Sequence, residues 1–452
     1  MRQSASPGDT SMSTASPSVS LDLADAERAA YRKIDLRIAA VLFGCFVLSF
    51  IDRVNISFAH LQMRQDIGLS DEQYGFAVGL LFFSYVLFEV PSNLLMVRIG
   101  ARKTLSRIMI AWGIVSTLTF AVQTPTHLYF ARLALGAAEA GFFPGALLFF
   151  THWYPAKRRA RVIGIFALAV PASGFLGGPL SGWILHAMND VGGMAAWRWL
   201  FVIEGIPSIV AGVLLYFFLT ERPKDARWLT DAEKTLIVSA LEAERNAKGQ
   251  DAASHHFGAA LKSPRLYIAA LVYTAVPWVA NVITYWSPAI IKQAGAANAF
   301  DVGLISMIPY AIGAVAMLLI CRSSDLRLER RWHWAACGTL AAASLVGLSF
   351  VMHDLMLTVV AITFLTIGFL GIAALFFTIP LAYLSGTAAA GGLALISALG
   401  QLAGSLAPMA IGHIKQQTGS VAGGLYLVAA VVMAAVAVVL WLIPSRTLHE
   451  RD

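Results

Sequence analysis

The sequence predicts an all-α membrane protein in which about twelve transmembrane helices form two halves of six. Three observations support this fold class. The chain is 58% hydrophobic and only 13% charged, whereas a soluble domain is about a quarter charged. Its apolar residues gather in segments of about 20 residues, the length that crosses a bilayer as a helix. A polar stretch in the middle of the chain divides these segments equally.

Each apolar segment lies between charged or Pro/Gly-rich breaks. Lipid offers no partner for an unpaired backbone amide, so each segment is expected to be helical. The segments cover approximately residues 36–61, 73–97, 104–122, 127–150, 160–187, 197–219, 266–291, 302–321, 332–352, 355–384, 388–414 and 422–443.

The polar parts of the chain complete the domain division. Residues 1–30 are rich in Ser, Ala and Pro, lack periodicity, and predict a disordered cytoplasmic tail that is not a signal peptide. An N-terminal bundle follows over 31–220, then a linker over 221–263, a C-terminal bundle over 264–445 and a short tail over 446–452. We expect the protein to be a monomer.

The linker carries its own helix signal. Thr230 and Glu233 form a capping box ahead of an apolar run, which predicts one amphipathic helix at the cytoplasmic face. His255 and His256 follow it without an acidic or Cys partner at ligand spacing, so a solvated loop is favoured over a metal site. No metal site is predicted elsewhere.

Basic residues indicate the orientation. They cluster after the second, fourth and eighth segments, whereas the intervening loops carry almost none. By the positive-inside rule both termini are cytoplasmic, and the net charge of +7 needs no nucleic-acid partner. The clusters are Arg98, Arg102, Lys103 and Arg107; Lys157, Arg158, Arg159 and Arg161; and Arg322, Arg327, Arg330 and Arg331.

Two of the apolar segments each contain two charged residues that are candidates for function. Asp52 and Arg53 fall in the first segment, and Arg132 and Glu139 fall in the fourth. An ionised side chain at mid-bilayer costs at least ~2.5 kcal/mol, so such residues usually face a polar cavity and serve ion or substrate movement. No phosphate-binding glycine loop is present, which argues against an enzyme and against ATP as the energy source.

Several motifs carry a family resemblance, and the basic loops of the two halves echo each other. The motifs are Asp52–Asn55, Phe88–Asn93, Arg98–Lys103, Arg132–Pro144, Trp197–Pro207, Glu221–Leu229 and Leu384–Ala390. Together they resemble the major facilitator superfamily, and within it the anion:cation symporter family, nearest to bacterial tartrate, sugar-acid and phthalate-type permeases. Val97 replaces the usual acidic residue of the first basic loop, whereas Asp325 keeps it in the second half.

This resemblance implies a major facilitator fold with two pseudo-symmetric six-helix bundles, and proton-coupled uptake of a carboxylate across the bacterial inner membrane. It assigns Asp52 and Glu139 to proton carrying and Arg53 and Arg132 to the substrate. Two guanidinium groups at similar depth suit a carboxylate or dicarboxylate, because each presents a planar fork of donors. The structural alternative is that Asp52 neutralises a cation and Glu139 pairs with Arg132 to hold helices together.

Further candidates come from the same resemblance. It places a substrate-contacting tyrosine at Tyr85, for which ordinary packing is the alternative. Phe377, Ser397 and Gln401 are expected in the second-half wall of the site, where relatives often have tryptophan and asparagines. These departures predict altered hydrogen bonding and therefore an altered substrate. Tyr285 and Trp286 line the outer gate or serve as interfacial anchors.

Other charged residues are expected to hold one conformation. Glu89 lies near the cytoplasmic end of the second segment, and we expect it to form a latch with Arg102 or Arg161. Asp325 is the corresponding acidic residue of the second half.

The preferred function is a proton symporter that imports a small organic anion such as tartrate or a sugar acid, with the lipid bilayer as surroundings and the proton in place of a cofactor. Two alternatives stay open. Gly and Pro residues between 174 and 182 resemble a drug/proton antiporter pattern, which favours an exporter or exchanger. The other alternative is a transporter-like sensor without flux.

Overall fold

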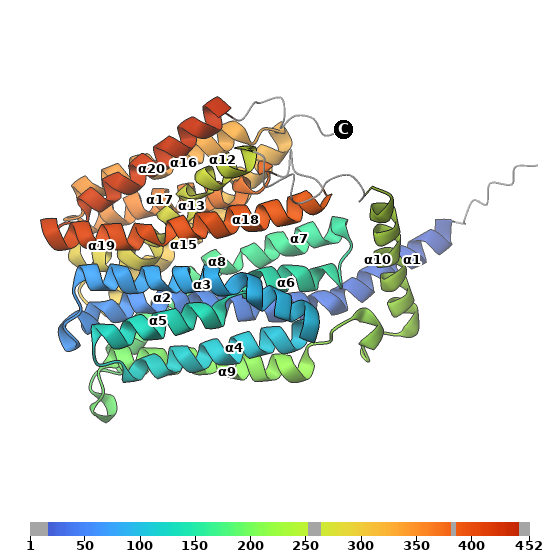
Figure 1. Ribbon diagram of the computed structural model, residues 1–452, viewed down its shortest axis with the longest axis horizontal. Coiled ribbons are helices and arrows are strands. Elements are labelled where there is room, and N and C mark those ends of the chain that lie inside the picture. The colour runs from blue at the N-terminus through green and yellow to red at the C-terminus, as the bar shows by residue number, and fades with distance from the viewer. Residues whose placement is uncertain (1–16, 252–263, 381–385, 443–452) are drawn as a thin grey trace, which may run out of the picture.

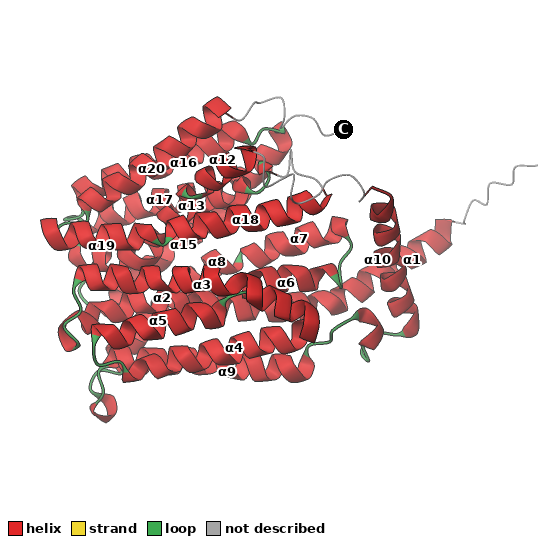
Figure 2. Ribbon diagram, in the orientation of Figure 1, coloured by secondary structure: helices red, strands yellow, loops and turns green. Residues whose placement is uncertain are grey.

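The computed structural model describes residues 17–251, 264–380 and 386–442, and these ranges contain helices and loops without any strand (Figure 2). Twelve of the helical stretches are long and apolar enough to cross a membrane, as the sequence predicts. His255, His256 and the C-terminal tail lie outside the described residues.

The N-terminal half, blue to green in Figure 1, contains six of these spans. Its elements are α1 (Pro17–Ile34), η1 (Asp35–Ala39), α2 (Ala40–Asp66), α3 (Asp71–Ile99), α4 (Ala101–Leu118), η2 (Thr119–Ala121), α5 (Pro125–Glu139), α6 (Phe142–Thr151), α7 (Ala156–Ala167), α8 (Ala169–Ala187), η3 (Val191–Gly193) and α9 (Ala196–Phe218). The linker contains η4 (Pro223–Asp225) and α10 (Asp231–Asp251).

The C-terminal half, yellow to red in Figure 1, contains the other six spans. Its elements are α12 (Pro264–Tyr273), α13 (Ala275–Asn281), η5 (Val282–Trp286), α14 (Ser287–Gln293), α15 (Ala299–Arg327), α16 (Arg331–Val351), α17 (Leu355–Phe376), α18 (Gly386–Gly404), α19 (Leu406–Thr418) and α20 (Ala422–Leu442). Several spans are therefore built from two or more consecutive helices.

The two halves lie side by side with their helices along the long axis of the molecule (Figure 1). They contact each other chiefly where α8 packs on α15 and where α3 packs on α19. Small residues allow the first of these approaches: a Cβ added at Gly182 would lie 2.6 Å from the carbonyl oxygen of Ala299, and one at Gly178 would lie 2.8 Å from that of Gly303. The glycine stretch of the fifth span is thus an interface between the halves.

One end of the molecule, here called the linker end, carries α1 and α10 at the right of Figure 1. The expected disordered tail is wrong for residues 17–30, because they belong to helix α1. Ala30, Tyr31 and Ile34 are spaced to share one helix face and are buried. The guanidinium of Arg158 lies 4.1 Å from the centre of the Tyr31 ring, which fixes α1 against the start of α7.

The linker helix α10 is attached to the same half. Lys33 Nζ of α1 lies 2.6 Å from Glu233 Oε1, and Arg159 Nη2 of α7 lies 3.1 Å from Glu244 Oε1. The predicted capping box is confirmed, since Thr230 Oγ1 accepts from the backbone of Glu233 and Glu233 Oε2 accepts from the backbone of Thr230. Helix α10 therefore begins where the sequence predicts and packs on the N-terminal half.

The opposite end, here called the distal end, joins the halves by polar contacts. Lys415 Nζ of α19 lies 2.9 Å from Asp71 Oδ1 at the start of α3, and His413 Nδ1 lies 2.9 Å from Glu72 Oε1. Further inside, the Tyr74 hydroxyl donates to the backbone oxygen of Tyr285 at 2.8 Å. The distal end is closed in this structure.

Candidate substrate site between the two halves

An ion pair inside the membrane-spanning region forms the centre of the candidate site. Arg53 of α2 donates from Nε at 3.2 Å and from Nη2 at 2.5 Å to Glu139 Oε2 of α5. The Arg53 guanidinium also lies 5.0 Å from the centre of the Phe50 ring and 5.7 Å from that of Tyr85. Glu139 therefore pairs with Arg53 and not with Arg132, which corrects the structural alternative considered for the sequence.

The local fold explains why Glu139 needs a cation. Glu139 is the last residue of α5, and the chain breaks there because Gly141 has a φ of +92°, a conformation that favours glycine. A carboxylate at the C-terminal end of a helix is disfavoured by the helix dipole. The Arg53 guanidinium offsets that effect, and Glu139 Oε1 is left buried without a hydrogen-bond partner among the described residues.

Arg132 is the second cation of the site. Its side chain is buried, with 2% of the residue exposed, and its Nε and Nη2 atoms lack hydrogen-bond partners within the described part of the chain. It interacts electrostatically with Tyr285, Tyr74, Glu139 and Asp52. An unpaired buried donor costs about 1 to 3 kcal/mol, and more when it is charged. This guanidinium is therefore a candidate to bind an anion.

Tyr285 brings the C-terminal half to the same site. It interacts electrostatically with Arg53, Arg132 and Glu139, and its hydroxyl is buried without a partner among the residues described. Arg53 and Glu139 thus lie near a residue of the C-terminal half. Two unpaired nitrogens of Arg132 and the Tyr285 hydroxyl together suit a carboxylate.

Asp52 points elsewhere, because successive residues on a helix are rotated by about 100°. It is fully buried inside the N-terminal half, where Oδ2 accepts from Trp112 Nε1 and Ser208 Oγ, each at 2.7 Å, and Oδ1 accepts from Ser116 Oγ at 2.9 Å. The hydrogen bonds of Asp52 therefore go to residues outside the Arg53–Glu139 pair. Asp52 still interacts electrostatically with Glu139.

The predicted second-half residues form a partly aromatic wall. Ser397 of α18 lies near the Tyr273 side chain, and the Phe377 ring lies 5.3 Å from the Tyr273 ring. Tyr85 interacts electrostatically with Arg53, Glu139 and Tyr273. Gln401 is half-buried on the same helix as Ser397, one turn further along. The structure thus links Tyr85 and Ser397 through Tyr273.

The predicted latch contacts are not formed among the described residues in this conformation. Within the described residues no ion pair joins Glu89 to Arg102 or Arg161. The backbone nitrogen of Arg102 donates to Glu221 Oε2 at 3.0 Å, and its guanidinium lies over the Tyr216 ring. Glu221 caps the start of α4 instead. Asp325 pairs within its own loop, with Arg330 Nη2 at 2.5 Å from Asp325 Oδ1.

Sequence reasoning missed Glu204. This residue of α9 is buried, with 3% exposed, and its Oε1 accepts from Ser181 Oγ of α8 at 2.7 Å. The signal was available, because Glu204 lies in an apolar segment in the same way as Glu139. Tyr285 was assigned to a gate or an interface, and its position beside both arginines was not foreseen.

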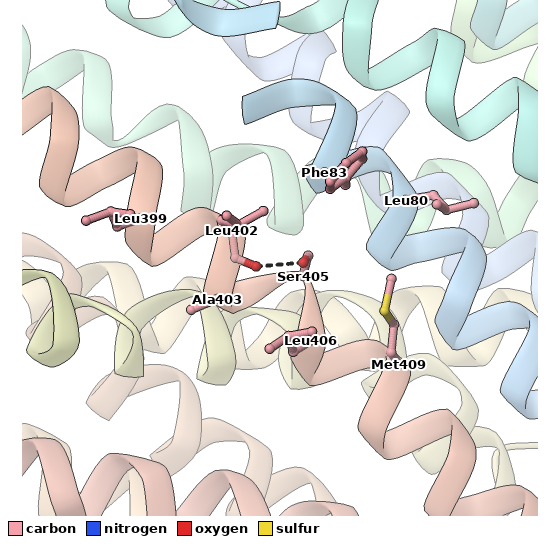
Figure 3. Close-up of a pocket in the computed structure, with 8 residues that line it drawn as sticks. All are labelled: Leu80, Phe83, Leu399, Leu402, Ala403, Ser405, Leu406 and Met409. Carbon is pink, nitrogen blue, oxygen red and sulfur yellow. Dashed lines mark hydrogen bonds between the residues drawn. The ribbon is translucent and has the colours of Figure 1, made fainter. Parts of the chain in front are cut away.

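An apolar groove lies apart from this ion pair, between α3 and the helices α18 and α19 (Figure 3). It encloses about 500 Å³ and is lined by Leu80, Phe83, Leu399, Leu402, Ala403, Ser405, Leu406 and Met409. Ser405, its one polar lining residue, donates its hydroxyl to the Leu402 backbone oxygen at 2.6 Å. A groove without a charged lining residue does not suit an anion.

Twelve spanning helices, with an ion pair buried where two bundles meet, define a multi-pass membrane transporter. The chain belongs to the Major Facilitator Superfamily, whose family model matches residues 41–408. This assignment confirms the family and the fold predicted from the sequence.

Similar proteins include transporters with different named substrates. A protein of Agrobacterium vitis named "Putative tartrate transporter" is 42% identical over 94% of this chain and 93% of its own. A quinolone resistance transporter of Acinetobacter baumannii is 35% identical over 90% and 94% of the two chains. The partially occluded, inward-open xylose transporter XylE of E. coli has a TM-score of 0.72 at 15% identity, covering 91% and 98%, which supports the fold alone.

Proposed function

We propose that this protein imports a small organic anion together with protons by alternating access, as a member of the anion:cation symporter family. The observation that carries the proposal is the unpaired Arg132 guanidinium beside the Arg53–Glu139 pair. Two guanidinium groups and one carboxylate leave a positive charge that a monocarboxylate neutralises. A neutral sugar would leave that buried charge uncompensated.

Protonation of Glu139 provides the coupling. A neutral Glu139 releases Arg53 from its ion pair, and both arginines then become available to a dicarboxylate such as tartrate. Binding of the anion and binding of the proton favour each other, because each stabilises the state in which Arg53 turns from Glu139 to the substrate. This mutual effect is the reciprocity expected of linked sites.

The orientation follows from the basic loops. We place the linker end in the cytoplasm and the closed distal end at the outer face of the bacterial inner membrane. The site then opens to the outside once the contacts of Asp71 and Glu72 with α19 separate. The protein works as a monomer, and protons are the only coupling species required.

The substrate class rests on the relatives and on the second-half wall. The tartrate transporters named above are the basis for a tartrate-like dicarboxylate or sugar acid. Ser397 lies near Tyr273, and Gln401 is the longer polar group on the same helix. A substrate that differs in size from tartrate fits this arrangement.

Export of an organic anion or drug is the second candidate, favoured by the quinolone resistance relative. Gly174, Gly178 and Gly182 of α8 also have a structural role, because they pack closely against α15. A sensor without flux is the third candidate.

One experiment separates these functions. The purified protein is placed in liposomes, and uptake of labelled tartrate, galactarate, glucarate and phthalate is measured with an inward pH gradient. Accumulation of one anion that a protonophore abolishes supports symport. Exchange without accumulation supports an exchanger, loss of anion from loaded vesicles against its gradient supports an exporter, and absence of all flux despite binding supports a sensor.

A further inference from the structure

A second acidic centre lies inside the N-terminal half, away from the Arg53–Glu139 pair. Asp52 and Asn55 are three residues apart on α2 and share one face, and Glu204 and Ser208 are four residues apart on α9 and share another. The two faces meet, since Ser208 Oγ donates to Asp52 Oδ2 at 2.7 Å. Glu204 and Asp52 interact electrostatically. The two carboxyl groups therefore lie near each other inside the N-terminal half.

The hydrogen bonds distinguish the two carboxyls. Asp52 accepts from three neutral donors, Trp112, Ser116 and Ser208, and an indole nitrogen can only donate. Glu204 Oε1 accepts from Ser181, and its Oε2 atom has no partner of acceptable geometry within the described ranges. The donors thus stabilise a charge on Asp52 and leave one oxygen of Glu204 free to carry a proton.

Asn55 completes the network. Its amide lies against Glu204, yet neither its nitrogen nor its oxygen has a hydrogen bond of acceptable geometry to any described residue. If Glu204 Oε2 carries a proton, its O–H group can donate a hydrogen bond to Asn55 Oδ1. Both unsatisfied groups would then be paired, as buried polar groups usually are.

The charges around Asp52 and Glu204 also favour one proton on the two carboxyls. The elements α4, α8 and α9 supply only neutral donors to it, and neither carboxyl has an ion-pair partner in the described chain. Arg132 and Glu139 of α5 act electrostatically on Asp52, and only Asp52 acts so on Glu204. Two carboxylates in one dry site cannot both be ionised without compensation.

We propose that Asp52 and Glu204 hold one proton between them, carried on Glu204, and that this acid pair is a second titratable site of the transporter besides Glu139. The proton's presence is a property of the folded chain. Its use in transport rests on the proposed function, because Arg132 connects Asp52 electrostatically to the substrate site. Release breaks the O–H bond of Glu204, leaves the electron pair on that oxygen and passes the proton to water that enters the network.

The test is infrared spectroscopy of the full-length protein in lipid nanodiscs near neutral pH. A buried protonated carboxyl gives a carbonyl stretching band apart from that of ionised carboxylates. We expect the wild type to show this band, Glu204→Gln to lose it, and Glu139→Gln to keep it. The proposal is overturned by wild type without a protonated band, or by a band of unchanged intensity in Glu204→Gln.

A second variant keeps the test independent of the folding of Glu204→Gln. Ser181→Ala removes the donor to Glu204 Oε1 and leaves every titratable group in place, so the band should persist at a shifted frequency. An unshifted band would contradict the assignment to Glu204.

Uptake is then measured as a function of pH in wild type and Glu204→Gln. A flatter pH profile in Glu204→Gln shows that the proton takes part in transport. A pH profile like that of wild type shows that the proton has only a structural role and overturns its assignment to transport. Failure of all anion uptake would defeat the proposed function and leave the infrared result standing.

Discussion

The Glu139 carboxylate at the end of α5 receives two hydrogen bonds from the Arg53 guanidinium of α2, through a single oxygen, Oε2. Its other oxygen, Oε1, is buried without a partner among the described residues. This asymmetric pairing leaves the carboxyl one position at which it can bind a proton without first breaking the ion pair.

Replacement of Glu139 by Gln should separate exchange from accumulation. The amide oxygen still accepts from Arg53, but the side chain can no longer bind a transported proton. We expect anion exchange between equal concentrations to continue and gradient-driven accumulation to be lost in liposomes. Equal accumulation by wild type and Glu139→Gln would remove this glutamate from the coupling mechanism.

Replacement of Arg132 by Lys should weaken anion binding strongly. A lysine keeps the charge but loses the planar fork of donors. Loss of one charge-assisted hydrogen bond costs about 1.5 to 3 kcal/mol, which corresponds to an affinity about 10- to 150-fold lower. Calorimetric titration of the purified variant with a transported anion measures this change.

The matched control for this substitution is Arg198→Lys. Arg198 donates to the Phe120 backbone oxygen at 2.6 Å and lies near Asp66, away from the ion pair of the site. Its replacement should leave affinity unchanged. A similar loss in both variants would show that the Arg132 effect comes from general destabilisation.

Replacement of Gly182 by Ala should disfavour the closed distal end. The added Cβ would lie 2.6 Å from the Ala299 backbone oxygen and 3.1 Å from the Gly303 Cα, so α8 and α15 must separate. In a variant with Cys45, Cys321 and Cys337 replaced by Ser, a Ser306→Cys reporter between these helices should react faster with a membrane-impermeant thiol reagent.

Gly164→Ala provides the control, because a Cβ at Gly164 meets nothing within 4 Å. This variant should keep the reporter rate of the parent protein. An unchanged labelling rate in Gly182→Ala would show that α8 and α15 adjust without opening. It would contradict the proposal that the glycines of α8 help to close the distal end.

Replacement of Glu233 by Gln should loosen α10 from α1. Burial raises the pKa of the Glu233 carboxyl, but hydrogen bonds from Lys33 and Thr230 lower it more, and the net pKa lies below the ordinary value. Its stabilising contribution is therefore present above the ordinary pKa of about 4.3 and is lost as pH falls through the lowered value. At neutral pH, hydrogen exchange in α10 should be faster in Glu233→Gln than in wild type.

Two comparisons test the cause. Glu242→Gln removes an exposed carboxylate from the same helix and should leave exchange as in wild type. Thermal unfolding of wild type and Glu233→Gln should differ at neutral pH and converge at acid pH below the lowered pKa of Glu233, where the wild-type carboxyl becomes protonated. A difference that persisted at acid pH would exclude the charge of Glu233 as its origin.

The spans were predictable because bilayer thickness and backbone hydrogen bonding leave helices as the only solution for such segments. The presence of Arg53, Arg132 and Glu139 at one site also followed, since charge is tolerated at that depth only in a polar setting. The sequence did not predict which of these residues pair. Arg132 and Glu139 share one face of a helix, but the partner of Glu139 comes from α2. Contacts between different helices cannot be predicted from the sequence alone.

Asp52 shows a second limit. Asp52 is adjacent to Arg53 in the chain, yet the helix turn between them directs Asp52 toward Trp112 and Ser208. The donors come from α4 and α9, which lie far along the sequence. The N-terminal helix was missed for a related reason, since Tyr31 gains its burial only from the docking of Arg158 and Tyr154.

The attachment of α1 and α10 to a single half has a practical consequence for measuring motion. Lys33, Arg158 and Arg159 secure both helices to the first bundle. A spectroscopic probe on α10 would therefore track that bundle as a rigid reference frame. Paired with a probe at the start of α16 in the other bundle, it would report rocking between the two without any label inside the membrane.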